Sequence, residues 1–226
     1  MRQVFHHELE QVAADLVSLA HLVSAAIQQS TRALLEADVQ LADHVIASDQ
    51  AIDARRNDLD LRSIDLLARQ APVAGDLRTV VASMRISGDL ERMGDLARHV
   101  AQVARMRYPQ HAVPADLRET FQQMGSVAQE IIARVADIIS TQSLDSARDI
   151  EEIDDQLDEL HRAMFTRLAE GTWQHGTTSA VDIALLSRYY ERFGDHAVTV
   201  ARRVSFLVTG ELGAIEPAAD AGIDDR

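Results

Sequence analysis

Glu91-Arg92-Met93-Gly94-Asp95 recurs one hundred residues later as Glu191-Arg192-Phe193-Gly194-Asp195. Over the surrounding stretches, 87–101 and 187–201, eight of fifteen positions carry the same residue. In both copies the carboxylates are four residues apart, a spacing that stacks them one turn apart on one face of an α-helix. Because like charges placed in this way repel slightly, the helix gains nothing from them unless a cation joins the pair. The repeat therefore predicts two similar helical units, each with its own carboxylate face.

Apolar residues recur at intervals of three and four along most of the chain, which is the period of amphipathic helices. Breaks at Asp38, at Pro72 and Gly75, around Pro109 and Pro114, and at 171–176 divide the pattern into six segments. We expect helices that end near residues 36, 70, 107, 141, 170 and 209, with Asp38 as the N-cap of the second. Short connections favour antiparallel neighbours. The predicted fold is thus all-α, with two tandem pseudo-symmetric three-helix bundles over 1–109 and 110–210, and a disordered tail over 211–226.

Composition narrows the classes of function. The chain has 226 residues and a formal net charge of −14, and all 22 of its basic residues are Arg. This balance argues against sequence-independent nucleic-acid binding, which needs a basic face. No Cys is present, so thiolate metal sites and disulfides are excluded. Acidic residues interrupt any N-terminal apolar run, and no long uncharged apolar stretch stands out, so we expect a cytoplasmic protein with peripheral membrane contact only.

Two stripes on the third helix of each unit have different expected roles. The first stripe is apolar in both copies and is predicted core: Ile86, Leu90, Met93, Ala97, Val100 and Ala104, matched by Leu186, Tyr190, Phe193, Ala197, Val200 and Val204. The second begins apolar at Leu77 and continues at the same spacing to Glu91 and Asp95, which places these carboxylates at the margin of the buried face. Gly94 and Gly194 each cost about 1 kcal/mol of helix propensity, which indicates close approach of another helix.

The middle helix of each unit carries acidic residues that could face these carboxylates. Folding the chain back about residue 72 places Asp49 and Asp53 opposite Asp95 and Glu91. Folding it about residues 173–174 places Glu151 and Asp155 near Asp195 and Glu191. Four carboxylates between two helices would suit Mg²⁺, Mn²⁺, Zn²⁺ or iron. The alternative is that these acids are solvated or paired with Arg, and Arg92 and Arg192 could neutralise part of each cluster.

The residues favour a non-enzymatic protein over an enzyme. No Ser-His-Asp or Cys-His arrangement is plausibly placed for catalysis, and the paired Glu-x-x-His motifs of oxygen-activating di-iron bundles are absent from the sequence. Three hypotheses remain. The first is a regulatory adaptor that binds proteins through its helical faces, and the second is a carboxylate-metal protein that stores metal or uses it in catalysis. The third is a purely structural bundle in which the repeated motif serves only packing.

The chain resembles the PhoU family of phosphate-uptake regulators, over about residues 5–209. The resemblance is carried by the repeated Glu-Arg-x-Gly-Asp helices, by the 70–78 entry to the third helix, and by the acidic stretch 154–161. Segments 173–176 and 190–198 are most similar to the actinobacterial members called PhoY. Arg56 and Asn57 depart from the family pattern, because they stand where further acidic residues would be expected.

The resemblance implies a function as well as a fold. It implies a negative regulator of the phosphate-starvation response, in which a cytoplasmic adaptor couples the phosphate-specific ABC transporter to the phosphate-sensing histidine kinase. The implied partners are the sensor kinase and the ATPase subunit of the transporter. It also implies metal sites at Glu91, Asp95, Glu191 and Asp195, together with their middle-helix partners. The sequence leaves open whether the protein is a monomer or a homodimer.

Overall fold

The structure is a computed structural model that describes residues 2–171 and 173–211. Six long α-helices account for nearly all of this part of the chain: α1 (Arg2–Glu36), α2 (Val39–Gln70), α3 (Ala74–Arg107), α4 (Arg118–Thr141), α5 (Leu144–Ala169) and α6 (Gly176–Thr209). A short 3-10 turn, η1 (Ala115–Leu117), precedes α4, and there is no strand among the described residues. The predicted all-α fold with six helices is confirmed. The predicted tail lies almost entirely outside the described residues.

Local sequence signals set the helix ends. Asp38 caps α2 as predicted, because its Oδ1 accepts a hydrogen bond from the Leu41 amide at 3.0 Å. Ser143 caps α5 in the same way, through the amide of Ser146. Gln142 and Gly210 end α4 and α6 in the left-handed conformation, which closes a helix C-terminus.

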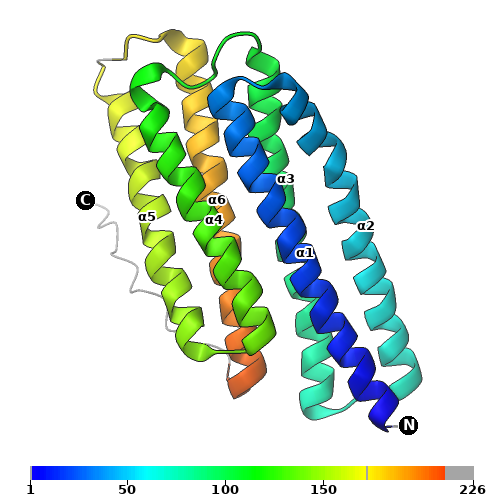
Figure 1. Cartoon of the computed structure of the whole chain (residues 1–226). Coiled ribbons are helices and arrows are strands. Elements are labelled where there is room, and N and C mark those ends of the chain that lie inside the picture. The colour runs from blue at the N-terminus through cyan, green and yellow to red at the C-terminus, as the bar shows by residue number, and fades with distance from the viewer. Residues whose placement is uncertain (1, 172, 212–226) are drawn as a thin grey trace.

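The two sets of three helices lie side by side (Figure 1). Helices α1 and α3 of the first half pack against α4 and α6 of the second, so these four helices form the interface between the halves. Helix α2 contacts only α1 and α3, and α5 contacts only α4 and α6, which places them at opposite outer edges. The acidic faces therefore lie between an outer helix and an interface helix in each half.

Buried apolar side chains from both halves form one connected core. Both copies of the predicted apolar stripe are buried throughout, including Met93 and its counterpart Phe193. Tyr190 crosses the interface between the halves, and its hydroxyl lies 2.8 Å from the Thr31 hydroxyl of α1. Because a buried hydroxyl is costly without a partner, this hydrogen bond helps to fix how the halves meet. The division of the chain into domains at residues 109 and 110 stays a prediction.

One helix segment, Phe5–Glu36, is long and apolar enough to cross a membrane by length and composition. In the structure this helix, α1, contacts α2, α3 and α4. Leu16, Leu19 and Val23 are buried in the core. Its apolar residues are therefore accounted for by packing within the bundle.

Candidate functional site: two acidic clusters

The first acidic cluster lies between α2 and α3, as predicted. Glu91 and Asp95 are about one-fifth exposed, at the margin of the buried face of α3. Asp49 faces them from α2, and its pKa is raised by burial and by the nearby charges of Asp53 and Asp95, against the lowering effect of Arg98. The pKa of Glu91 is likewise raised by burial and then by Asp95, and the charge of Asp53 adds to it. The four residues named from the sequence therefore share one electrostatic neighbourhood.

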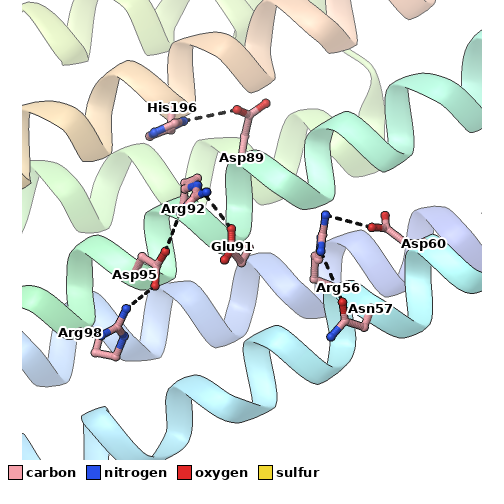
Figure 2. A network of polar contacts seen from close by, with 9 residues as sticks. All are labelled: Arg56, Asn57, Asp60, Asp89, Glu91, Arg92, Asp95, Arg98 and His196. Atoms are coloured by element: carbon pink, nitrogen blue, oxygen red, sulfur yellow. Dashed lines mark hydrogen bonds and ion pairs between the residues drawn. The ribbon is translucent and has the colours of Figure 1, made fainter.

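Arg98 joins the two helices of this cluster. Its Nε lies 2.6 Å from Asp49 Oδ2, and its Nη2 lies 2.5 Å from Asp95 Oδ1. Arg92 contacts Asp95 at 3.1 Å and Glu91 at 3.7 Å, as Figure 2 shows. A guanidinium thus lies between α2 and α3 and pairs with a carboxylate of each helix. Arg92 therefore neutralises part of the acidic cluster, as the sequence suggested. Arg98, which was not identified from the sequence, makes the closer contacts with the carboxylates.

The nearby departures from the family pattern also bring positive charge. Arg56 on α2 contacts Asp60 at 3.1 Å and donates to the Asn57 side chain at 3.3 Å (Figure 2). Its charge lowers the pKa of Glu91, against the larger raising effects. The first cluster is consequently a compensated network of acids and arginines.

The second acidic cluster lies between α5 and α6, but its α5 members are Asp154 and Asp158. The pKa of Asp154 is raised to about 8, mainly by burial and then by the charges of the nearby acids Asp158, Asp195, Asp155 and Glu191. Burial also raises the pKa of Asp158, with Asp195 as the next cause. These four side chains, Asp154, Asp158, Glu191 and Asp195, are hereafter the second cluster.

The α5 acids named from the sequence, Glu151 and Asp155, have different surroundings from Asp154 and Asp158. The Glu151 carboxylate accepts a hydrogen bond from Arg202 Nε at 3.1 Å. Asp155 is exposed and affects the cluster only through its charge. Pairing Asp154 with Asp195 and Asp158 with Glu191 places the fold-back centre just beyond residue 174. The pair Asp154 and Asp158 has the same spacing of four residues, and the assignment of Glu151 and Asp155 as metal ligands stays a prediction.

The second cluster is not compensated by a bridging arginine. Arg188 pairs with Glu191 on the same helix, and Arg192 lies 3.7 Å from Asp195. Asp154 Oδ1 and Glu191 Oε2 are buried and have no hydrogen-bond partner among the described residues. A cavity of about 340 Å³ adjoins Asp154, Asp195 and Val198. Buried carboxylate oxygens without partners are costly, so they favour either a proton or a bound cation here.

The repeated glycines permit close helix approach, as predicted. A Cβ at Gly94 would lie 2.9 Å from Ile52 Cδ1, and one at Gly194 would overlap Asp154 Oδ1. In the second half, the missing side chain therefore lets a carboxylate approach the backbone of α6.

Neither cluster has the side-chain arrangement of a preformed metal site. Within residues 2–171 and 173–211, no three His, Asp or Glu side chains are arranged around a common point as ligands would be. The donor chemistry nevertheless differs between them. The second cluster, with two orphaned oxygens, fits a hard divalent cation, whereas Arg98 fills the first.

Fold and site together define an all-α protein built from a duplicated three-helix unit, with a carboxylate face on the outer side of each unit. The PhoU domain model matches residues 16–104 and 121–204, one copy in each half. The chain belongs to the PhoU family.

Relatives and solved structures agree with this assignment. The chain is 44% identical to the phosphate-specific transport system accessory protein PhoU homolog 2 of Mycobacterium tuberculosis, over 93% of this chain and 99% of the relative. It is 42% identical to PhoU homolog 1 of Mycobacterium leprae, over 94% and 96%. The crystal structure of PhoU from Pseudomonas aeruginosa has a TM-score of 0.80 at 28% identity, covering 92% of this chain and all of that one. PhoU from Streptococcus pneumoniae has a TM-score of 0.83 at 25% identity, covering 92% and 98%.

Proposed function

We propose that this protein regulates phosphate transport and keeps the phosphate-starvation response off when phosphate is plentiful. The observation that carries the proposal is the match to mycobacterial phosphate-specific transport accessory proteins over more than nine-tenths of the chain. Its proposed partners are the ATPase subunit of the phosphate ABC transporter and the phosphate-sensing histidine kinase. The protein works as a cytoplasmic adaptor rather than an enzyme, and reaches the membrane only through these partners.

The shape of the molecule supports an adaptor. The six helices form long parallel faces on opposite sides of a shared core, so two partners can bind at once without competing. Arginines exposed along these faces can anchor protein interfaces. The net charge of −14 speaks against direct contact with DNA, so control of transcription passes through proteins.

Gene deletion tests the regulatory function. A reporter of phosphate starvation should switch on in phosphate-rich medium after deletion, and wild-type protein supplied in trans should switch it off. If the reporter stays silent in a strain that also lacks every paralogue, the regulatory function is wrong. Pull-downs from cells grown with and without phosphate test the coupling, and they should recover the kinase and the ATPase.

The second cluster is also proposed to hold a divalent cation. Asp154, Asp158, Glu191 and Asp195 would hold it, and the ion would screen their mutual repulsion and tie α5 to α6. The support for this proposal is the pair of buried carboxylate oxygens without a hydrogen-bond partner. The first cluster is not proposed to hold a cation, since the Arg98 guanidinium already screens its carboxylates and links α2 to α3.

A further inference from the structure

A cavity of about 330 Å³ opens where the N-terminal part of α3 meets the C-terminal part of α6. Four arginines line it, Arg78 and Arg85 from α3 and Arg202 and Arg203 from α6, and Val81 and Phe206 contribute apolar surface. The volume is that of a small-molecule pocket. Four guanidinium groups around one cavity are unexpected in a chain that carries a net charge of −14.

Two of the four arginines have their charge balanced and two do not. Arg202 pairs with Glu151 at 3.1 Å, and Arg203 lies 2.7 Å from Asp89 Oδ2. Arg78 and Arg85 form no ion pair within residues 2–171 and 173–211. The Arg78 guanidinium carbon lies 5.7 Å from the centre of the Phe206 ring. Its Nε is buried without a hydrogen-bond partner among those residues.

The internal repeat shows that packing does not require these arginines. At an offset of one hundred residues, Arg78 and Arg85 correspond to Thr178 and Leu185, and Arg202 and Arg203 correspond to Gln102 and Val103. None of the four equivalent residues is charged, yet α3 and α6 also meet at that end, where Arg107 on α3 pairs with Asp182 on α6 at 2.5 Å. The two ends therefore differ, because Arg107 is paired with an acid whereas Arg78 and Arg85 have no ion pair among the described residues.

We propose that this cavity binds a phosphate-bearing ligand, with the phosphate held by Arg78 and Arg85. Guanidinium groups match the geometry of phosphate oxygens and form paired charge-assisted hydrogen bonds with them. The apolar wall at Val81 and Phe206 accommodates an apolar or aromatic group attached to the phosphate. This chemistry is shared by free phosphate, nucleotides and phospholipid headgroups. The inference stands on the cavity and is separate from the proposed regulatory function.

Binding to purified full-length protein tests the proposal, with calorimetry for small probes and co-sedimentation for vesicles. The probes are inorganic phosphate, AMP, and phosphatidylcholine vesicles with and without phosphatidylglycerol. Adenosine serves as the probe without phosphate. The variant is Arg78→Gln with Arg85→Gln. The matched control is Arg69→Gln with Arg148→Gln, which changes the net charge equally at exposed positions elsewhere. Thermal unfolding confirms that each variant is folded.

At least one phosphate-bearing probe should bind to wild-type protein, and the Arg78/Arg85 variant should weaken it by about tenfold or more. The control variant should bind like the wild type, adenosine should not bind, and added salt should weaken binding. Which probe binds identifies the source of the phosphate. The proposal is wrong if no phosphate-bearing probe binds, or if the two double variants weaken binding equally.

Discussion

The acidic clusters of the two halves occupy equivalent places on a duplicated unit, yet they balance their charge in different ways. In the first half, Arg98 reaches from α3 to Asp49 on α2. The equivalent position in the second half is Val198, which is buried beside Asp154 and Asp195. At this position the first cluster has an arginine that bridges its two helices, whereas the second has an apolar side chain and two buried carboxylate oxygens without a hydrogen-bond partner among the described residues. The comparison shows that a motif can be repeated while the chemistry around it diverges.

Cation binding should show the largest difference between the halves. After chelator treatment, the protein should take up Mn²⁺ or Zn²⁺, and Asp154→Asn with Asp195→Asn should weaken uptake by about tenfold to a hundredfold, because two charged oxygen donors are lost. Glu159→Gln, an exposed change on α5, is the control. Calorimetry and elemental analysis provide the measurement. If Asp49→Asn with Asp95→Asn abolishes uptake instead, the assignment of the two clusters is reversed.

Moving the arginine tests the comparison directly. Arg98→Ala should destabilise the protein by about 1–3 kcal/mol, since it leaves partly buried carboxylates facing one another without a cation. Urea unfolding measures this change, and Arg148→Ala, at an exposed pair, is expected to stay within about 0.5 kcal/mol of wild type. Val198→Arg should supply the missing bridge and reduce cation uptake. Unchanged uptake in a folded Val198→Arg protein would contradict the proposed equivalence.

The pH dependence of stability should report the proton held by Asp154 in the second cluster. The pKa of Asp154 is raised to about 8 from its ordinary value of 3.8, so between these values the folded state holds a proton that the unfolded state has already released. Stability should therefore fall as pH rises from about 4 to 8, by up to about 1.4 kcal/mol per pH unit for one proton. Asp154→Asn should flatten this slope in metal-free protein, whereas Glu159→Gln should not. Equal slopes in both variants would rule out Asp154 as the source.

Substitution of the two repeated glycines should show the smallest difference in stability between the halves. Ala at position 94 gains helix propensity and needs only the end of the flexible Ile52 side chain to move, so stability should change by less than about 1 kcal/mol. Ala at position 194 displaces the Asp154 carboxylate and also crowds Leu157 at 3.1 Å, so it should cost about 1 kcal/mol more. Denaturant midpoints of the two single variants measure this. Identical midpoints would mean that Asp154 can move away freely.

The sequence by itself determined the six helices, their ends and the buried stripes, because these follow from local periodicity and capping. It also determined the family and the position of Glu91, Asp95, Glu191 and Asp195 at the edge of the core. Only the tertiary structure decided which acids of α5 face Glu191 and Asp195. A change of a few residues in the fold-back centre before α6 exchanges Glu151 for Asp154 while keeping an acidic spacing of four.

The tertiary structure also decided which charges are balanced. Arg98 lies three residues beyond Asp95 in the sequence, and nothing in that spacing shows that its guanidinium reaches Asp49 on another helix. Likewise, Arg78 and Arg202 are far apart in the chain and line one cavity only because α3 and α6 pack together. Periodicity fixes the face on which a side chain lies. Its partner depends on the register and contacts of helices that fold from distant parts of the chain.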